Sequence, residues 1–285
     1  MDISIVIPCK NEAKGLSVIL PDLIKIYPNA EIIISDDASE DETADVIRQF
    51  SEYNVRHITR PYSLGNGGAI KAGARVATGD VIVFMDGDGQ HRPEDIAALL
   101  RKLEEGYEMV VGARDADGQA SLPRRMANAF YNRFSSWMVG HRIMDLTSGF
   151  RAVRREKFLE FIHLLPNTFS YPTTCTMAFF RAGYPVGYVP VRVEKRIGKS
   201  HIRILRDGLR FLIIIFKIGT LFSPLKIFLP VAAFMFACGC GWYAYTFATI
   251  GRFTNMSALL FTGSVMVFLL GLISEQITTL MYKGD

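Results

Sequence analysis

Cysteine is scarce in this chain and forms no recognisable pattern. The sequence has four cysteines among 285 residues, and their positions show no paired spacing of the kind that holds zinc. Cys238 and Cys240 lie in an apolar stretch, where a cysteine most simply serves as a small apolar side chain. The sequence therefore predicts neither a zinc site nor a disulfide framework, and it is typical of a reducing compartment.

The chain also lacks an excess of one charge. The 32 Lys and Arg residues nearly balance the 28 Asp and Glu residues, which leaves a formal net charge of +4. This balance does not favour a nucleic-acid partner. The first residues are acidic, and the apolar run Ile3–Ile7 is too short for the core of a secretory signal, so we expect no signal peptide.

Charged residues are absent from two long stretches near the C-terminus, 227–251 and 253–274. Each is long enough to supply the roughly 20 apolar residues that span a bilayer, and together they explain the positive mean hydropathy of +0.20. Because the connector around Arg252 is short, we expect a transmembrane helical hairpin over 225–281. A buried helical pair in a soluble core is the alternative.

Basic residues predict the orientation of this hairpin. Five basic residues lie before the first apolar stretch, and Lys283 follows the second. The connector between the two stretches holds Arg252 alone. Those before the first stretch are Arg203, Arg206, Arg210, Lys217 and Lys226. Since basic residues collect on the cytoplasmic side, we expect a multi-pass protein of the inner or plasma membrane with a cytoplasmic N-terminal domain.

Residues 203–222 are expected to form an amphipathic helix on the membrane surface. Arg203, Arg210 and Lys217 recur every seven residues and therefore share one helical face. Their position directly before the first apolar stretch favours the membrane interface. A solvent-facing helix packed on the N-terminal domain is the alternative.

Residues 1–202 alternate between strand-like and helix-like stretches. The expected strands are Ile3–Ile7, Glu31–Ser35, Val55–Thr59, Asp80–Met85 and Tyr107–Val111. The expected helices are Gly15–Tyr27, Glu40–Phe50, Gly67–Ala77, Pro93–Glu104 and Pro123–Val139. This alternation predicts an α/β domain with a mostly parallel sheet and helices on both faces.

Two aspartates directly follow one of these strands. The run Val81–Met85 is short, apolar and β-branched, and it is followed by Asp86, Gly87, Asp88, Gly89 and Gln90. The glycines allow both carboxylates to converge just past the carboxyl end of the strand, which is where open α/β sheets bind ligands. Hard oxygen donors there suit Mg2+ or Mn2+. An Asp-Gly turn without a metal is the alternative.

Several segments, in this order and spacing, resemble the family 2 glycosyltransferases, and specifically the polyprenyl-phosphate glycosyltransferases. The resemblance covers roughly residues 1–215 and is strengthened by the apolar hairpin that follows. The matching segments are Ile7–Glu12, Ser35–Ser39, Gly65–Gly73, Asp86–His91, Gly112–Arg114, Asp145–Arg151 and Gly198–His201.

The resemblance implies a GT-A fold, which is Rossmann-like with a mostly parallel sheet, and a UDP- or GDP-linked sugar as donor. By similarity, Asp86, Asp88 and Gln90 hold the Mg2+ or Mn2+ ion that bridges the diphosphate. The nucleotide-side residues it implies are Pro8, Glu12, Asp37 and Asp86. Asp37 would accept a hydrogen bond from the base, whereas Asp36 is expected to cap the turn.

The resemblance also implies a cluster of cations for a lipid phosphate. This acceptor is already anionic near neutral pH, so it needs cations and exclusion of water more than a strong base. The acceptor-side candidates are Arg114, Arg124, Arg125, Arg196 and Ser200, with Lys199 as the alternative to Arg196. Where the family often has a lysine, this chain has His201.

Asp88, Asp145 and Arg114 are the expected catalytic residues. Asp145 either orients the acceptor or a sugar hydroxyl, or is a turn carboxylate, and Arg151 closes the loop that shapes the sugar pocket. His91 is either a residue behind the metal or nucleotide site or a surface histidine, and Lys71 is either a phosphate contact or a solvated lysine.

The resemblance therefore predicts inverting transfer of one hexose-type sugar from a nucleoside diphosphate to a polyprenyl phosphate at the cytoplasmic membrane face. The alternatives are a synthase that extends a polysaccharide and a catalytically degenerate scaffold. Small residues in the hairpin are of the kind that pack transmembrane helices together, so a homo-oligomer is possible. A separate flippase, which would move the lipid-linked sugar across the membrane, is a further possible partner.

Overall fold

The computed structural model describes most of the chain, apart from residues 115–121, 168–169, 194–215, 217–218 and 282–285 and the side chains of 122–128. The described chain divides into two compact units, Met1–Ile202 and Arg203–Asp285. Most of the amphipathic helix predicted over 203–222 lies outside the described residues, so that expectation stays a prediction.

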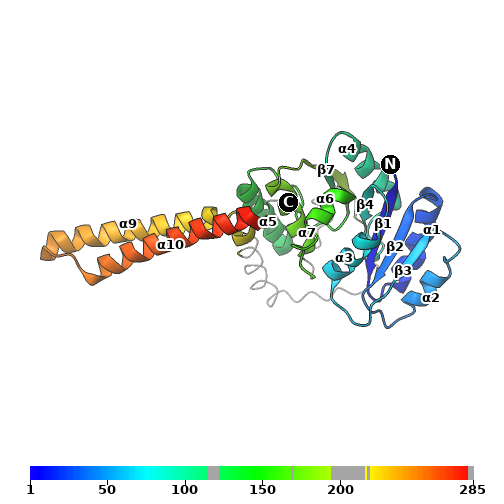
Figure 1. Ribbon diagram of the computed structural model, residues 1–285, viewed down its shortest axis with the longest axis horizontal. Coiled ribbons are helices and arrows are strands. Elements are labelled where there is room, and N and C mark those ends of the chain that lie inside the picture. Colours follow the sequence, from blue (N-terminus) through cyan, green and yellow to red (C-terminus); the bar gives the residue numbers. More distant parts are fainter. Residues whose placement is uncertain (115–121, 168–169, 194–215, 217–218, 282–285) are drawn as a thin grey trace. The chain divides into compact units, whose positions relative to one another are not determined.

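The N-terminal unit is built on one seven-stranded sheet (Figure 1). Its strands are β1 (Ile3–Cys9), β2 (Glu31–Asp36), β3 (Val55–Ile58), β4 (Val81–Phe84), β5 (Met109–Arg114), β6 (Arg151–Arg154) and β7 (Val186–Val191). Their order is β3-β2-β1-β4-β6-β5-β7, and only β6 runs antiparallel to its neighbours β4 and β5. The predicted α/β fold class with a mostly parallel sheet is confirmed.

Helices cover both faces of this sheet. They are α1 (Ala13–Ile26), α2 (Thr43–Arg48), α3 (Asn66–Val76), α4 (Ile96–Glu104), α5 (Leu122–Val139), α6 (Arg155–Glu160) and α7 (Tyr171–Arg181), with a short 3-10 turn, η1 (Pro93–Asp95), before α4. Leucines of α1 and α4 join the alternate residues Ile5, Ile7 and Val83 in one buried cluster. Because both faces are covered, β1 and β4 are continuous apolar runs.

The other face of the sheet is covered by α3, α6 and α7. Gly73 of α3 packs directly against Val6, where a Cβ would overlap the valine. Phe84 at the end of β4 contacts Phe158 of α6, with ring centroids 4.8 Å apart. The same Phe84 pairs with Arg151 at the start of β6, which brings the segment before β6 to the carboxyl end of β4.

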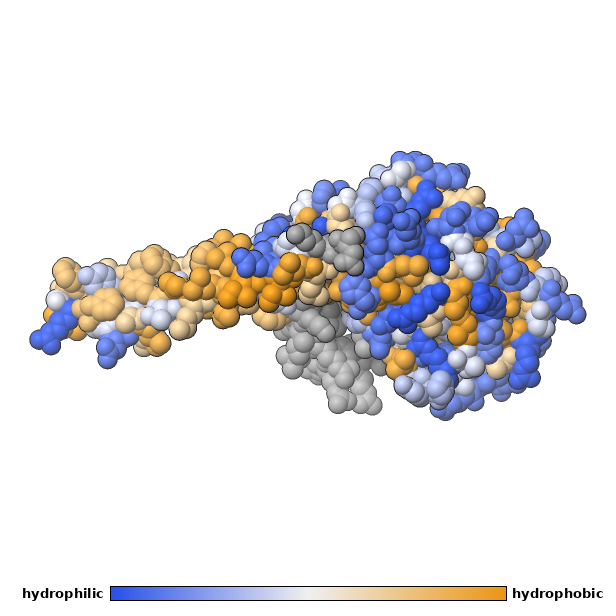
Figure 2. All heavy atoms as spheres, in the orientation of Figure 1, coloured by the Kyte–Doolittle hydropathy of each residue, from blue (hydrophilic) through white to orange (hydrophobic). Residues whose placement is uncertain are grey.

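The C-terminal unit contains two long helices, α9 (Pro224–Ile250) and α10 (Asn255–Met281), which pack along each other (Figure 1). Both are long and apolar enough to cross a membrane, with mean hydropathies of 1.7 and 2.2. Figure 2 shows apolar side chains over most of the hairpin surface, whereas polar residues cover much of the N-terminal unit. An apolar exterior over this length fits a lipid environment.

Small residues line the seam between the two helices. On α10, Ser257, Ser264, Gly271 and Thr278 are buried at intervals of seven residues. Ala232 and Gly239 are their buried counterparts on α9, and the Ser264 hydroxyl donates to the Ala232 carbonyl at 2.8 Å. Small side chains allow the backbones to approach, and a seven-residue repeat keeps the seam between the helices.

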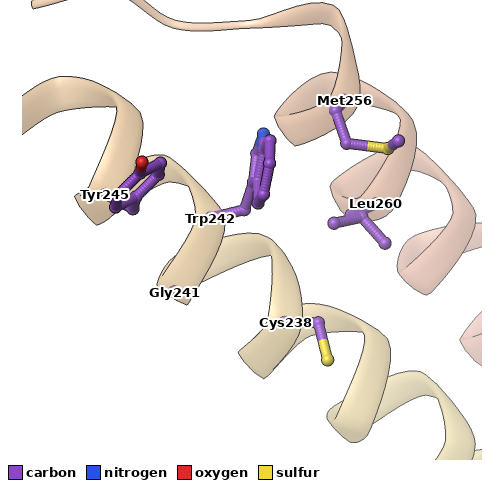
Figure 3. A pocket seen from close by; sticks show the side chains of 6 residues that line it. All are labelled: Cys238, Gly241, Trp242, Tyr245, Met256 and Leu260. Carbon is purple, nitrogen blue, oxygen red and sulfur yellow. The ribbon is translucent and has the colours of Figure 1, made fainter. Parts of the chain in front are cut away.

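A shallow apolar groove lies on the hairpin near its connector (Figure 3). It is lined by Cys238, Gly241, Trp242, Tyr245, Met256 and Leu260. Trp242 reaches from α9 towards α10, and its indole N–H donates to the Thr254 hydroxyl at 3.3 Å. The indole therefore ties the end of the first helix to the start of the second.

The seam predicts an asymmetric response to glycine substitution. A Cβ at Gly271 would lie 2.7 Å from Cβ of Phe228, whereas a Cβ at Gly241 meets nothing within 4 Å. We expect Gly271→Leu to force the helices apart and to lower hairpin stability by about 1–3 kcal/mol, the usual range for overpacking. Gly241→Leu, the matched control, should leave stability unchanged or slightly raised. Thermal unfolding of the full chain in detergent, followed by circular dichroism, measures both; equal stability of the two variants would contradict the seam.

Candidate functional site

The candidate site lies where the strand order of the sheet reverses. The chain leaves β1 towards β2 on one side and later returns to β4 on the other. At such a switch point, the loops after neighbouring strands diverge and leave a crevice at the carboxyl edge of the sheet. The loop after β4, residues 85–91, lies at this edge and carries both predicted metal-binding aspartates.

The two aspartates of this loop differ in exposure. Asp88 is buried, with 7% of its surface exposed, and Asp86 is half-buried. The backbone N–H of Gln90 donates to the Asp88 carboxylate at 3.1 Å, and Gly89 adopts a positive φ of 73° that favours glycine. The chain therefore turns back on itself between Asp88 and Gln90.

These donors fit a divalent cation, although they do not complete its coordination. Two carboxylates and the Gln90 amide are hard oxygen ligands of the kind that Mg2+ and Mn2+ prefer. Among the described residues, no group of three or more His, Cys, Asp and Glu side chains could hold a metal ion. Such an ion would therefore take its remaining ligands from water or from a bound phosphate.

Two glycines from distant segments contact the loop after β4, residues 85–91, which is called the metal loop below because it carries the predicted metal-binding residues. Gly15 in the first turn of α1 faces Gly87, where a Cβ would overlap the Gly87 carbonyl oxygen. A Cβ at Gly149, in the segment before β6, would lie 3.0 Å from an Asp86 carboxylate oxygen. Sequence reasoning missed Gly15, because a glycine inside a helical pattern reads as a weak helix former.

Arg114 and Asp145 form a bidentate ion pair beside this loop. Nε of Arg114 donates to Asp145 at 2.7 Å and Nη2 at 3.0 Å, while Nη2 also donates to the Thr147 hydroxyl at 2.6 Å. The Asp145 carboxylate also accepts from the backbone N–H groups of Arg114, Thr147 and Ser148. Both carboxylate oxygens of Asp145 therefore accept hydrogen bonds, and these bonds hold the 145–148 turn together.

Burial and pairing act in opposite directions on this pair. Burial would raise the pKa of Asp145, but the hydrogen bonds and charge of Arg114, with the Thr147 N–H, hold that pKa below its usual value. Burial likewise opposes the charged form of Arg114, yet the Asp145 hydrogen bond and charge raise the pKa of Arg114. Both groups therefore stay charged near neutral pH.

His91 is buried behind the metal loop, so the surface alternative is wrong. Its ring stacks on Phe150 with centroids 4.7 Å apart, and only 6% of the residue is exposed. Burial lowers the pKa of His91 to about 4, with Asp88 opposing and Arg114 supporting this shift. The imidazole is therefore neutral near pH 7, and its Nδ1 has no hydrogen-bond partner in the part of the chain that the structure describes.

Arg151 supports the 145–149 loop from inside the protein. It is fully buried, and its guanidinium donates to the carbonyls of Pro172 and Ser148 and to the Thr176 hydroxyl. All of these acceptors are neutral. Arg151 ends this loop at the start of β6, which turns the side chain into the core towards α7. That the loop shapes a sugar pocket stays a prediction.

The predicted nucleotide-side residues follow β1 and β2. Pro8 is buried within β1, and Glu12 is half-buried at the start of α1. Asp36 accepts from both the N–H and the hydroxyl of Ser39, so it caps the turn as expected.

Asp37 holds the segment before α3. Its carboxylate accepts from the Ser63 hydroxyl at 2.6 Å and from the backbone N–H groups of Leu64 and Gly65. Burial opposes ionisation, but these three bonds and nearby Arg60 keep the pKa of Asp37 below its usual value. Contact of Asp37 with a base stays a prediction, because no nucleotide is bound.

Lys71 is half-buried and bound within the protein, and its contact with a phosphate stays a prediction. Its ammonium donates to the Leu165 carbonyl at 3.0 Å. Burial, with smaller contributions from Arg75 and Arg60, lowers the pKa of Lys71. Lys71 therefore joins α3 to the segment after α6.

Most of the remaining acceptor-side candidates are not described. Arg124 and Arg125 lie in the first turn of α5, but their side chains are outside the described residues. Arg196, Lys199, Ser200 and His201 all fall within 194–215, which is also outside them. Of the acceptor-side set, the structure places only Arg114.

Comparison with known proteins matches both units of the chain. Residues 4–161 match the family model described as Glycosyl transferase family 2, and residues 223–280 match the model described as GtrB C-terminal hairpin.

Curated relatives carry names of lipid-phosphate sugar transferases. The undecaprenyl-phosphate 4-deoxy-4-formamido-L-arabinose transferase of Photorhabdus laumondii is 34% identical over 60% of this chain and 57% of its own length. The undecaprenyl-phosphate mannosyltransferase of Micrococcus luteus is 29% identical over 70% of this chain and 87% of its own. The dolichyl-phosphate hexose transferase of Haloferax volcanii is 27% identical over 73% and 89%. The chain thus spans little more than half the length of the first of these relatives.

Solved structures support the GT-A fold of the N-terminal unit. Glucosyl-3-phosphoglycerate synthase from Mycobacterium tuberculosis, in complex with Mn2+, UDP and phosphoglyceric acid, matches with a TM-score of 0.59 and 18% identity. The match covers 76% of this chain and 78% of that chain. At this identity the likeness concerns the fold alone.

The contact between Gly15 and the metal loop generates a stability prediction. We expect Gly15→Ala to lower the free energy of unfolding by about 1–3 kcal/mol, because the added methyl group overlaps the Gly87 carbonyl. Helix propensity alone would favour alanine by about 1 kcal/mol, so a loss must come from the clash. The control is Ser17→Ala at an exposed position of the same helix. Equal melting temperatures of the two variants would argue against the contact.

The Arg114–Asp145 pair generates a prediction about pH. Its carboxylate has a lowered folded-state pKa, so its stabilisation is complete above the unfolded value of about 3.9 and is lost as pH falls through the folded value. Asp145→Asn should therefore cost about 2–3 kcal/mol at pH 7, below the usual loss for a fully buried pair because Arg114 is partly exposed. The difference in melting temperature should be constant from pH 8 to 5 and should begin to shrink once the pH falls below the unfolded value of about 3.9. A difference that widens on acidification would contradict this assignment.

Proposed function

The chain belongs to glycosyl transferase family 2, and on that premise we propose that it transfers one hexose-type sugar from a nucleoside diphosphate to a polyprenyl phosphate, with inversion at the anomeric carbon. The observation that carries this proposal is the loop with Asp86 and Asp88 at the carboxyl edge of the sheet, beside the Arg114–Asp145 pair. The relatives' names support the acceptor class.

In this proposal, the donor diphosphate lies over the loop after β4. Asp86, Asp88 and Gln90 would hold Mg2+ or Mn2+, which neutralises charge on the departing nucleoside diphosphate when bound. His91 behind this loop is buried and neutral near pH 7, so it adds no positive charge there. Pro8, Glu12 and Asp37 lie on the neighbouring strand ends and would line the nucleotide pocket.

Arg114 is suited to orient the acceptor phosphate. Its Nε and Nη2 are bound to Asp145 and Thr147, whereas its two Nη1–H donors have no bond to the described residues. The pair therefore fixes the plane of the guanidinium and leaves one edge for a phosphate oxygen. Arg124, Arg125, Arg196 and Ser200 are proposed to complete the acceptor side.

Asp145 serves this reaction as a positioning residue in our proposal. A carboxylate whose oxygens are occupied and whose pKa is lowered is a poor general base. The acceptor does not need one, because a phosphate monoester carries its nucleophilic oxygen as an anion near neutral pH. Attack on the sugar face opposite the nucleotide would then give inversion in one displacement.

We further propose that α9 and α10 span the inner or plasma membrane and that the N-terminal unit is cytoplasmic. The excess of basic residues before α9 over the single Arg252 in the connector supports this orientation. A second copy of the chain and a separate flippase remain predictions about its partners.

The direct test is transfer by purified full-length protein. It would be incubated with Mg2+ or Mn2+, undecaprenyl or dolichyl phosphate, and a panel of UDP- and GDP-sugars, and the lipid product identified by mass. We expect one donor to give a lipid-linked sugar. Asp88→Asn should lower turnover at least about 100-fold, because a metal contact worth several kcal/mol in the transition state is lost.

Two controls make this test decisive. Ser17→Ala should retain wild-type turnover, and chelation of the metal should stop the reaction until Mn2+ is restored. If no donor in the panel labels the lipid, or if Asp88→Asn turns over at the wild-type rate, the proposed function is wrong.

A further inference from the structure

The segment between β3 and α3 carries an exposed aromatic ring at the carboxyl edge of the sheet. Residues 59–65 leave the edge strand β3 and lead to α3, which packs against β1 and β2. They therefore cross the same edge from which the loops after β1 and β2 emerge. Tyr62, near the middle of this segment, has 65% of its surface exposed.

The segment is tied to the end of β2 directly after Tyr62. The Ser63 hydroxyl donates to the Asp37 carboxylate at 2.6 Å, and the backbone N–H groups of Leu64 and Gly65 donate to it at 2.8 and 2.7 Å. Asp37 is only 3% exposed, so the segment lies over this carboxylate. A ligand that approaches Asp37 from the crevice would therefore meet the segment.

The segment is also tied to α3. The Arg60 guanidinium donates to the Gly68 carbonyl in the first turn of that helix. A Cβ at Gly68 would lie 2.9 Å from Cβ of Leu64, so the helix and the segment pack closely. The backbone on both sides of Tyr62 is therefore fixed, although its ring is exposed.

Exposure alone does not distinguish Tyr62, because single exposed apolar residues are common on protein surfaces. Tyr53 is 55% exposed, but it precedes β3, which runs parallel to β2, and so lies at the amino edge of the sheet. Tyr62 follows the same strand and lies at the carboxyl edge, where open α/β sheets bind ligands. The two tyrosines therefore form a matched pair with different expected roles.

We propose that the ring of Tyr62 stacks on the heteroaromatic base of the donor nucleoside diphosphate. This inference rests on the proposed function, and it adds a residue that recognises the face of the base. Stacking on an aromatic side chain suits any base, because every base has a π face. Asp37 then has a second task, since its hydrogen bonds to the segment hold the stacking residue in place.

The charge around Tyr62 favours a base over a lipid surface. The loop after β2 carries exposed acidic residues, namely Glu40, Asp41 and Glu42. Arg60, the cation of the segment, lies 3.7 Å from the Asp37 carboxylate that balances it. Acidic side chains repel anionic lipid head groups, whereas the base of a nucleotide is uncharged.

The first experiment measures ligand binding by the full chain in detergent with Mn2+. Titration calorimetry gives the Kd of UDP, of GDP and of inorganic pyrophosphate, which has no base. We expect Tyr62→Ala to weaken binding of the nucleotide about 10-fold, within the range for loss of a base-stacking ring, and to leave pyrophosphate binding unchanged. Tyr62→Phe should bind as the wild type does, because the ring stacks and the hydroxyl does not. Tyr53→Ala is the matched control and should change none of the three constants.

A second experiment observes the ring itself. Trp137→Phe and Trp242→Phe remove both tryptophans of the sequence, and Tyr62→Trp in that chain provides a single indole. We expect UDP or GDP to quench its emission, with a midpoint at the Kd from calorimetry, because the base stacks on the indole. Tyr53→Trp in the same background should not respond to either nucleotide.

Three results would overturn the proposal while transfer by the wild-type chain still supports the proposed function. They are nucleotide binding by Tyr62→Ala at the wild-type Kd, an equal loss of pyrophosphate binding, which indicates damage to the diphosphate site, and an indole at position 62 that bound nucleotide leaves unquenched. If the wild-type chain binds neither UDP nor GDP, the proposed function and this inference are both wrong.

Discussion

The loop after β4 is confined between two glycines, and the geometry of the whole site depends on that confinement. Gly15 allows α1 to touch the Gly87 carbonyl, and Gly149 allows the segment before β6 to approach the Asp86 carboxylate. The loop also starts from a fixed point, because β4 is paired with β1 in a sheet that is buried on both faces. Backbone contacts at Gly87 and at Gly149 thus help to fix the positions of the two carboxylates.

Charge in the site is arranged around a single structural pair. The Asp145 carboxylate accepts hydrogen bonds from Arg114 and from the turn that follows, and burial keeps His91 neutral. Arg151 adds a buried cation whose acceptors are all neutral. The 145–151 segment is therefore a scaffold: its charged residues fix the loop and the plane of the Arg114 guanidinium.

Most of the sheet was predictable because buried parallel strands read as β-branched runs, as Ile3–Ile7 and Val81–Met85 do. Strands β6 and β7 were not predicted. Strand β6, Arg151-Ala152-Val153-Arg154, is short and begins and ends with arginine, and β7 contains Pro190. Burial of Arg151 and His91 also left no signal, since charged and polar residues are normally exposed. The predicted metal-binding residues were identified from the spacing of Asp86, Asp88 and Gln90. The glycines beside that loop are recognised only from contacts between residues far apart in the sequence.

The pairing of Arg114 with Asp145 also bears on turnover. A cation already neutralised by a carboxylate adds almost no net charge to the site. In the proposed site, Arg114 would therefore select a phosphate by the direction of its two remaining N–H donors more than by attraction. In the proposed reaction, the acceptor is a monoester with up to two negative charges and the product is a diester with one. Because the Arg114–Asp145 pair is nearly neutral, the positive charge that would favour the dianionic acceptor over the monoanionic product has to come from the other proposed arginines, Arg124, Arg125 and Arg196.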